Sequence, residues 1–596
     1  MEIWRDGDLN PEQVDAIKAP GSVFVVACPG SGKTRTLTFK IAYELRRLTS
    51  DKQRVIAITY TTRAAEEIRE RIDALGVETT QLWIGTIHAF CLEWILKPYG
   101  IYHPHLSHGF RVLNTHDTEK LLTEICESCG KRVTHWDCDF YFTKEGYMLA
   151  CHEERKHHAI HEVLEKYFAV LAERRQIDFE LMLFYASELV RDHPAISMVL
   201  GKLFAFILID EYQDTKAIQY FIVASILRAS QGSARAFIVG DPNQSIFQSL
   251  GGFPIAVSEF ADMAGIEFQE LELWRNYRSS GRIIEYFGKF NAYDTKIEAA
   301  SDGKNFPSLI SFNCTVHKDN LEDELARLIR LNIDAGVPAN EICILAPWWV
   351  SLAGMTRRLV LRLPEYEFDG PGMVPFARDI ENFWYKLSRI ILTTASLEMY
   401  VRRRRWAAEI LRDLEDAGAK PSDLDVRTLL RLCNSIQIEE TGGLRYLALF
   451  FEKLFSQIGV DIEASPTLSE HRAAFFDSSN SRIERLRKEG AEFIADIRNF
   501  RRVFEHKRGI TISTIHGIKG DEYDTVIAYA LLEGMVPHFS DSEGRDSATK
   551  LLYVIGSRAR KHLHLISERG RQRGRYGTYD TTEVLAECDY VYNEVI

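Results

Sequence analysis

The sequence lacks any long run of apolar residues, although 46% of its 596 residues are hydrophobic. A helix that crosses a membrane needs about 20 consecutive apolar residues, so we expect no membrane partner. The first residues, MEIWRDGDLN, are charged and lack the apolar stretch of a secretory signal. The ten cysteines follow no regular framework, which is typical of free thiols in a reducing compartment. We therefore expect a cytoplasmic protein.

An excess of basic residues is also missing. The formal net charge of -12 argues against a nucleic-acid binder that is basic throughout. A net negative charge does not exclude a basic groove, because DNA phosphates are attracted by the positive charges near the binding surface. The length predicts roughly three or four domains.

A recognisable zinc pattern is missing as well. Cys126 and Cys129 precede four further candidate ligands, namely His135, Cys138, Cys151 and His152. The later spacings match no common zinc site. Since Cys126 and Cys129 follow apolar residues at helical spacing, we favour a buried helix face over a zinc knuckle.

What the sequence does contain is a phosphate cradle near its start, VFVVACPGSGKT. Residues 23–27 predict a buried strand and residues 35–47 a helix. The glycines between them let backbone N–H groups turn toward a phosphate, and the helix N-terminus adds positive charge. The alternative is a glycine-rich turn that binds nothing. The predicted nucleotide-binding residues here are Ala27, Cys28, Pro29, Gly30, Ser31, Gly32, Lys33, Thr34 and Arg35.

Two side chains of this cradle have specific expected roles. Lys33 should reach the β- and γ-phosphates, and the Thr34 hydroxyl should bind Mg²⁺. Ala27 stands where the usual pattern has its first glycine, which is a small departure.

Adjacent carboxylates follow another apolar strand, at residues 204–209. We expect Asp210 to hold Mg²⁺ and Glu211 to activate the attacking water. Acidic residues also favour helix N-termini, but the cradle makes the catalytic interpretation stronger. Gln244 follows the strand at 236–240 and is a candidate sensor of the γ-phosphate.

Four residues elsewhere suit the same ligand. The Gln13 amide has the donor and acceptor that an adenine edge requires. Tyr277 offers a flat face for adenine, and Arg278 offers a fork for phosphate. The alternative is that Arg278 and Ser279 only cap the helix that follows them. Arg558 is the candidate arginine finger.

The remaining pattern gives the domain organisation and a basic run. Strands are expected at 54–60 and at 81–90, the latter ending in Thr86 and His88. Helical insertions without strands are expected over about 96–190 and 380–505. The four arginines at 402–405 could bind the phosphates of a DNA backbone. We favour the interpretation that they form a solvent-exposed face of a helix.

These segments together resemble the superfamily 1A DNA helicases of the UvrD/Rep/PcrA kind. The resemblance rests on an ordered series between residues 9 and 565: LNPEQ, ACPGSGKT, TYTTRAAEEIRERI, GTIHAF, LIDEYQD, VGDPNQSIF, NYRS, STIHGIKGDEYDTV and LLYVIGSRARKHLHL. It implies an α/β fold of two RecA-like parallel-sheet motor domains, each with a helical insertion. The implied boundaries are 1–95 with 191–279, 96–190, 280–380 with 506–596, and a reduced insertion at 381–505.

The resemblance also assigns residues. Gln13 and Tyr277 would hold adenine, Glu522 would meet the ribose, and Gln244, Arg278 and Arg558 would contact the γ-phosphate. The implied DNA track comprises Tyr60, Thr61, Arg63, Thr86, His88, Phe247 and His516.

The expected activity is that of an ATP- and Mg²⁺-dependent 3′→5′ helicase or translocase on single-stranded and tailed duplex DNA. Ser249 and Leu250 stand where the family has an aromatic residue and an arginine, so grip on the strand is expected to be weaker or supplied elsewhere. The alternative is a DNA-stimulated ATPase that unwinds weakly and serves a partner nuclease in a Gabija-type anti-phage system. A nucleotide-gated binding protein is disfavoured by Lys33, Glu211 and Arg558.

Overall fold

The structure is a computed structural model whose chain forms two compact units, residues 1–318 with 515–596 and residues 319–514. The expected division into motor domains and insertions stays a prediction. Its boundaries at 380/381 and 506, and its outer limits at residues 1 and 596, fall outside the described residues. The described residues are 3–130, 132–143, 145–370, 373–376, 379, 382–488, 492–505, 508–539, 541, 543–573 and 577–594.

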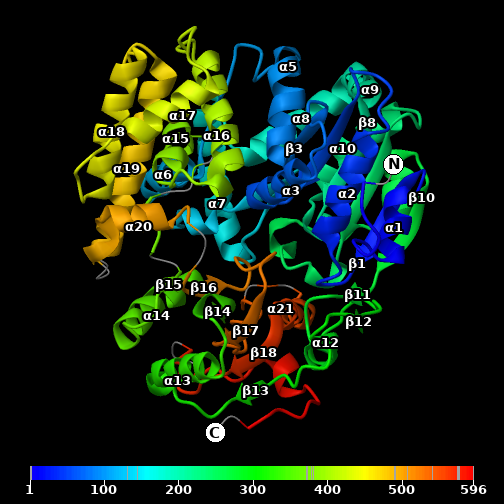
Figure 1. Ribbon diagram of the computed structural model, residues 1–596, viewed down its shortest axis with the longest axis vertical. Coiled ribbons are helices and arrows are strands. Elements are labelled where there is room, and N and C mark those ends of the chain that lie inside the picture. Colours follow the sequence, from blue (N-terminus) through cyan, green and yellow to red (C-terminus); the bar gives the residue numbers. More distant parts are fainter. Residues whose placement is uncertain are drawn as a thin grey trace. The chain divides into compact units, whose positions relative to one another are not determined.

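A six-stranded parallel sheet organises the first unit (Figure 1). Its strand order is β10-β1-β9-β8-β2-β3. Its central strands are almost wholly buried, because helices cover both faces of a parallel sheet. The strands are β1 (Ser22–Ala27), β2 (Arg54–Thr59), β3 (Leu82–Thr86), β8 (Phe204–Asp210), β9 (Arg235–Gly240) and β10 (Phe268–Leu273).

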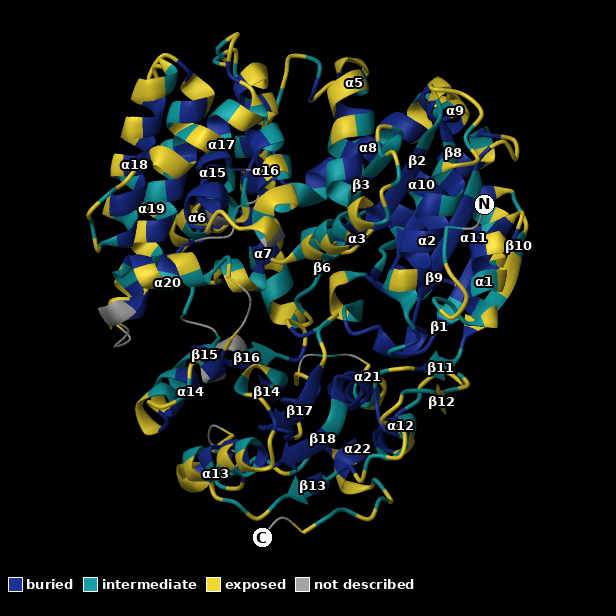
Figure 2. Ribbon diagram, viewed as in Figure 1, coloured by how far each residue is buried: buried dark blue, intermediate teal, exposed yellow. Residues whose placement is uncertain are grey.

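Alternate residues of each strand enter different cores, as the two-residue period of a strand requires. In β1, Val23 and Val25 pack with α2 (Lys33–Leu45) and α3 (Thr62–Ala74). Phe24 belongs to the opposite core, which includes α10 (Ala217–Ala229). Figure 2 shows β1 and α10 as largely buried, whereas most of α3 is intermediate or exposed.

The segment at 96–190 was expected to contain no strands, and that expectation is wrong. β5 (Phe140–Thr143) and β6 (Gly146–Leu149) form an antiparallel hairpin, and β4 (Arg111–Val112) pairs with β7 (Gln176–Ile177). Strands this short leave no periodic signal. The helices are α6 (Thr115–Ser128), α7 (Glu154–Glu173) and α8 (Phe179–Asp192), with α9 (Pro194–Leu203) after them.

Cys126 is buried on α6, as the helix-face interpretation predicted. Its Sγ lies 3.8 Å from Cys138 Sγ, while Cys129 lies at the carboxyl end of the helix. Among the described residues, no group of three or more His, Cys, Asp or Glu side chains gathers to hold a metal.

The first unit ends in a second set of strands and helices. β13 (Ile310–Asn313) pairs with β18 (Ala559–Ile566), which pairs with β17 (Tyr523–Ala528), all in parallel. Around them lie α12 (Gly281–Gly288), α21 (Arg545–Ser557), α22 (Glu583–Ala586) and the short pair β11 (Arg275–Asn276) with β12 (Glu298–Ala299).

The second unit combines parallel strands with a helical subdomain. β14 (Ile342–Ala346) and β15 (Phe368–Asp369) both pair with β16 (Ile510–Thr514) in parallel. Buried Trp384 lies in the core of the helical part. The helices are α13 (Leu321–Asp334), α14 (Trp349–Arg362), α15 (Phe383–Ile391), α16 (Leu397–Asp416), α17 (Val426–Ser435), α18 (Gly443–Ile458), α19 (Pro466–Lys488) and α20 (Ile497–Arg502).

The basic run at 402–405 lies on α16 and does not form a uniform solvated face. Arg403 is buried and donates hydrogen bonds to Asn434 Oδ1 at 2.7 Å and to the Ile390 carbonyl at 3.2 Å. Across the described parts of both units, no helix has the length and apolar character to cross a membrane.

Candidate functional site

Two glycines shape the loop after β1. Gly30 and Gly32 have φ angles of 67° and 79°, which side chains adopt only with strain. A Cβ on Gly30 would lie 2.5 Å from Arg278 Cβ, and one on Gly32 would lie 2.6 Å from Gln13 Nε2. Glycine at both positions therefore lets this loop approach Arg278 and Gln13.

The loop offers donors that fit a triphosphate. Gly32 is the N-cap of α2 and has no side chain with which to cap the helix, so backbone N–H groups of the first turn remain for a ligand. Ser31 Oγ is buried without a hydrogen-bond partner. Lys33 is the first residue of this helix and Thr34 the second. Orphan donors, a cation and a hydroxyl match phosphate oxygens and Mg²⁺ in kind.

The carboxylates after β8 lie beside this loop. Lys33 Nζ is 3.9 Å from Glu211 Oε1. Glu211 has a left-handed backbone, with φ 55°, an uncommon conformation that persists only where its surroundings impose it. Gln213 Nε2 donates to Glu211 Oε2 at 2.6 Å, which fixes the carboxylate's direction. The structure thus brings together the predicted phosphate-binding lysine and the predicted base.

The two carboxylates titrate in opposite directions. Burial raises the pKa of Asp210, and the neighbouring charge of Glu211 raises it further. Burial alone would also raise the pKa of Glu211, but the charges of Lys33 and Lys519 outweigh it and the pKa is lowered. Glu211 is therefore the ionised member of the pair, as a general base must be.

Gln244 and Arg558 meet in the buried interior. Gln244 Nε2 donates to Asp241 Oδ2 at 2.7 Å, while its Oε1 accepts a hydrogen bond from Arg558 Nη2. Burial lowers the pKa of Arg558 to about 10, so the guanidinium keeps its proton at neutral pH. The predicted sensor and the predicted finger are thus directly connected.

Lys519 is a residue that the sequence-based prediction missed. Its ammonium forms an ion pair with buried Asp214 and donates to the Gln244 carbonyl at 2.7 Å. Its only signal was its place between His516 and Glu522.

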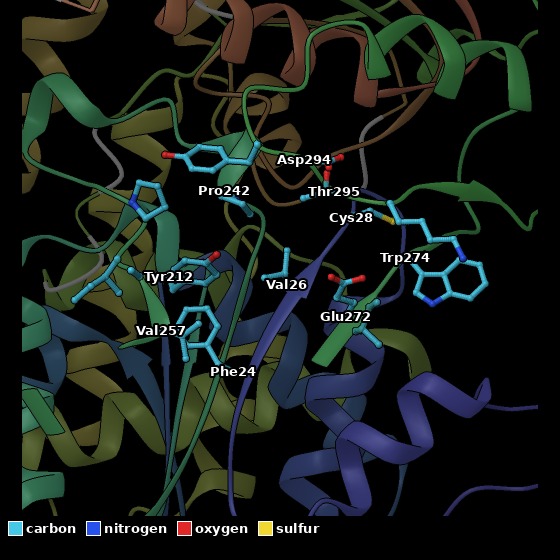
Figure 3. A pocket seen from close by; sticks show the side chains of 16 residues that line it. Phe24, Val26, Cys28, Tyr212, Pro242, Val257, Glu272, Trp274, Asp294 and Thr295 are labelled. Atoms are coloured by element: carbon cyan, nitrogen blue, oxygen red, sulfur yellow. The ribbon is translucent and has the colours of Figure 1, made fainter. Parts of the chain in front are cut away.

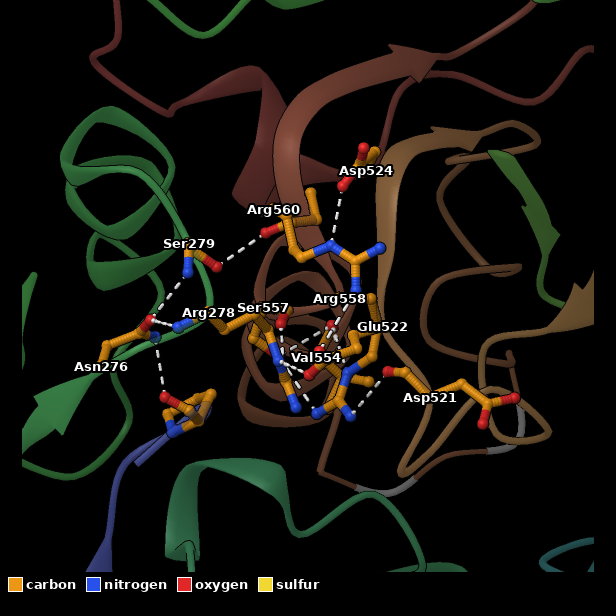
Figure 4. A network of polar contacts seen from close by, with 12 residues as sticks. Asn276, Arg278, Ser279, Asp521, Glu522, Asp524, Val554, Ser557, Arg558 and Arg560 are labelled. Atoms are coloured by element: carbon orange, nitrogen blue, oxygen red, sulfur yellow. Dashed lines mark hydrogen bonds and ion pairs between the residues drawn. The ribbon is translucent and has the colours of Figure 1, made fainter. Parts of the chain in front are cut away.

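Arg278 is fixed by a network of polar contacts (Figure 4). Asn276 Oδ1 accepts from the Arg278 N–H at 2.8 Å, and Asn276 Nδ2 donates to the Pro29 carbonyl at 2.7 Å. Arg278 Nε donates to Glu522 Oε2 at 2.5 Å, and Nη1 donates to the Ser557 carbonyl at 2.8 Å. Glu522, predicted to meet the ribose, is thus also the ion-pair partner of a phosphate-binding candidate.

The two adenine candidates are connected through Asn10. Gln13 Oε1 accepts from the Asn10 N–H at 3.0 Å, and its Nε2 donates to the Ser31 carbonyl at 3.0 Å. Tyr277 is 42% exposed, and its hydroxyl accepts from Asn10 Nδ2 at 2.8 Å. Their contact with adenine stays a prediction. Arg35 pairs with Asp8.

Three of the predicted DNA residues form an aromatic row. The rings of Tyr60 and Phe247 are 5.1 Å apart, and those of Phe247 and His516 are 5.4 Å apart. Lys519 Nζ lies 5.5 Å from the Phe247 ring, and Tyr60 is 40% exposed. Rings beside a cation suit a strand of stacked bases and phosphates.

The other four predicted DNA residues have structural partners. Thr61 and Thr86 cap α3 and α4 (Ile87–Phe90), accepting from the N–H groups of Ala64 and Ala89. The cap interpretation is therefore confirmed for Thr61, and the DNA contacts of both stay predictions.

Arg63 pairs with Asp521 Oδ1 at 2.6 Å. His88 lies in α4, so the expectation that it ends the strand is wrong, because β3 ends at Thr86. The His88 ring packs edge-on against Phe179, and burial lowers the pKa of His88 to about 4. The imidazole is therefore neutral.

A cavity of about 330 Å³ borders the end of β1 (Figure 3). The Cys28 side chain lines it together with Phe24, Tyr212, Pro242 and Trp274. Burial raises the pKa of the Cys28 thiol to about 12. Since the side chain faces this cavity, we expect any contact of Cys28 with phosphate to use its backbone, and that contact stays a prediction.

Comparisons with known proteins agree with this geometry. The family model of the UvrD/REP helicase N-terminal domain matches residues 9–262, and that of the UvrD-like helicase C-terminal domain matches residues 467–570. The chain is 26% identical to the ATP-dependent DNA helicase srs2 of Schizosaccharomyces pombe, over 94% of this chain and 71% of that protein.

Two bacterial relatives give the same result. A putative ATP-dependent DNA helicase of Bacillus subtilis, YjcD, is 24% identical over 95% of this chain and 80% of its own length. DNA helicase II of Escherichia coli is 30% identical over 46% of this chain, and the match spans only 39% of that protein. The parallel sheets described above fit the two RecA-like motor domains of such proteins. The chain therefore belongs to the UvrD-like DNA helicases of superfamily 1A.

Proposed function

We propose that this chain hydrolyses ATP at the site around Lys33 and uses the energy to move 3′→5′ along single-stranded DNA and to unwind tailed duplexes. The observation that carries the proposal is the convergence of Lys33 and Arg558 on the Glu211–Gln244 region. Lys33 lies 3.9 Å from Glu211, and Arg558 donates to Gln244. The charges of both cations lower the pKa of Glu211, and cations near a catalytic carboxylate suit a triphosphate attacked by water.

Each residue of the site has a proposed part in hydrolysis. Lys33 and the loop N–H groups bind phosphates, and Glu211 accepts the proton of the attacking water. Arg558 stabilises the charge that develops on the transferred phosphoryl group. Thr34 and Asp210 would hold Mg²⁺, which neutralises phosphate charge when bound.

The nucleotide site is connected to the aromatic row over a few residues. Gln244 precedes Ile246, whose carbonyl lies 3.1 Å from His516 Nε2. Lys519 contacts both the Gln244 carbonyl and the face of Phe247. A change at the γ-phosphate thus has a short physical route to the strand, which is how alternating grips are coupled to hydrolysis.

The proposal is tested by strand displacement on duplexes with a 3′ or a 5′ single-stranded tail, with ATP and Mg²⁺. We expect unwinding from the 3′-tailed substrate, and none with a nonhydrolysable analogue or after chelation of Mg²⁺. Unwinding that requires a 5′ tail would contradict the proposed direction.

A second candidate is a DNA-stimulated ATPase that serves a partner nuclease in cytoplasmic phage defence. Ser249 and Leu250, in place of an aromatic residue and an arginine, favour it because both changes weaken grip on a strand. Copurification with a nuclease, together with poor unwinding alone, would support this candidate. Robust unwinding of long duplexes by the isolated chain would count against it.

A further inference from the structure

The aromatic row stops at the turn that follows Phe247. This turn, η6 (Gln248–Leu250), folds back so that the Gly252 N–H donates to the Phe247 carbonyl at 3.2 Å. Ser249 has no ring for stacking on a base, and Leu250 is apolar and 44% exposed. On this side of Phe247, the turn itself supplies no aromatic surface.

The β5–β6 hairpin, far away in sequence, directs a ring toward this turn. Phe142 stacks on Phe184 with centroids 4.2 Å apart, and Phe140 packs edge-on against Phe168 at 5.3 Å. These contacts fix one face of the hairpin in the core. Because neighbouring residues of a strand point to opposite faces, Tyr141 points away from that core.

Tyr141 rests against the glycine that ends the turn. A Cβ on Gly251 would lie 2.8 Å from Tyr141 Cδ2, so the ring lies directly on backbone that only glycine leaves open. Lys216 Nζ is 5.8 Å from the ring centroid and 2.5 Å from Glu180 Oε1. Lys216 also forms a backbone bridge with Gly252. The half-buried ring therefore has a defined position beside the turn, with a cation next to it.

We propose that Tyr141 contacts single-stranded DNA beside Phe247 and supplies the aromatic face that Ser249 does not. The inference rests on the proposed function and extends its strand-binding surface into the hairpin. A flat ring on a glycine platform suits the stacking of any base, and the neighbouring ammonium suits a backbone phosphate.

The first test measures binding of a fluorescent oligo(dT) strand over a series of salt concentrations. We expect Tyr141→Ala to raise the Kd about tenfold, because loss of one stacked base typically costs about that factor. The salt dependence should keep its slope, since no cation is removed. Tyr141→Phe should bind normally, whereas Tyr141→Leu, which fills similar space without a ring, should bind as weakly as Tyr141→Ala.

Met148 provides a matched control because it pairs with Tyr141 across the hairpin and is 52% exposed. Met148→Ala should leave the Kd unchanged. If Tyr141→Leu binds DNA as tightly as the unmodified chain while its thermal unfolding is also unchanged, the inference is wrong.

A double-mutant cycle tests the contact with Gly251. Gly251→Ala should weaken DNA binding by displacing the ring, and it should weaken it much less in a Tyr141→Ala background. The positive φ of Gly251 is strained in both backgrounds, so the difference reports the ring contact. Equal effects of Gly251→Ala in the two backgrounds would show that the contact between Gly251 and the Tyr141 ring does not contribute to DNA binding.

Failure of the inference is distinguishable from failure of the proposed function. If the unmodified chain bound no single-stranded DNA and its ATPase did not respond to DNA, the motor itself would be excluded. If the unmodified chain responds and the Tyr141 variants match it, only the hairpin contact is excluded.

Discussion

Glu211 occupies a backbone conformation that few side chains adopt, with φ 55° and ψ 50°. Its carboxylate is directed by Gln213 and faces the ammonium of Lys33. A strained residue held by surrounding contacts is typical of functional sites, where geometry matters more than local stability. This placement distinguishes Glu211 from an ordinary acidic helix cap.

Glu211→Gln should lower the rate of ATP hydrolysis by at least about a hundredfold, because it removes the base. ATP binding should persist, since the cradle is untouched. Phosphate release and binding of a fluorescent ATP analogue measure the two effects. The exposed Glu78→Gln serves as the control. Near-normal turnover in Glu211→Gln would show that another group activates the water.

Gly32 gives a second prediction at this scale. Gly32→Ala places a Cβ 2.6 Å from Gln13 Nε2 at a strained φ of 79°, so either the loop or the Gln13 amide must move. We expect weaker binding of ATP by roughly tenfold or more, with the affinity for single-stranded DNA retained. Gly76→Ala is the control, since its φ is 64° but nothing lies near its Cβ position. Unchanged ATP affinity in Gly32→Ala would argue against this loop as the cradle.

At the scale of elements, the turn that carries Gln244 is tied to the segment after α12. Asn243 is fully buried, and its Oδ1 accepts from the N–H groups of Ala292 and Tyr293 at 2.8 and 2.7 Å. Its Nδ2 donates to the Tyr293 carbonyl at 3.1 Å and to Thr295 Oγ1 at 2.9 Å. This one side chain therefore holds two elements together beside the sensor.

Asn243→Ala should destabilise the fold by about 1–3 kcal/mol, because the part-buried N–H groups of Ala292 and Tyr293 lose their acceptor. The variant should unfold at a lower temperature, and its ATPase should become less responsive to DNA. Asn320→Ala is the comparison, since that exposed asparagine makes no side-chain cap bond. An unchanged unfolding temperature for Asn243→Ala would contradict the proposed role of Asn243 in holding the two elements together.

Elements were predictable where their signal is local. Apolar runs placed β1, β2, β8 and β9 within a residue or two, because strands buried on both faces contain few polar interruptions. The β5–β6 hairpin was not predicted, because strands of four residues are too short to show a clear alternation of apolar and polar residues. Asn243 was likewise missed, since its partners lie about 50 residues further along the chain.

For the whole molecule, the motif series predicted which residues converge, but not how they are connected. Lys519 and Asp214 pair although they are 305 positions apart, and no local pattern announces such a contact. The burial of Arg403 within a run of four arginines could not be predicted either, because composition does not say which side of a helix faces a core. Contacts between distant segments need the fold.

The central claim is that residues from both ends of the chain form one DNA-responsive ATPase site. It is tested most directly by phosphate release, with and without single-stranded DNA, from the unmodified chain and from Arg558→Ala. We expect DNA to stimulate the unmodified chain strongly and Arg558→Ala to lose about a thousandfold in DNA-stimulated turnover while remaining folded. Turnover that ignores DNA, or that survives the loss of Arg558, would contradict the account.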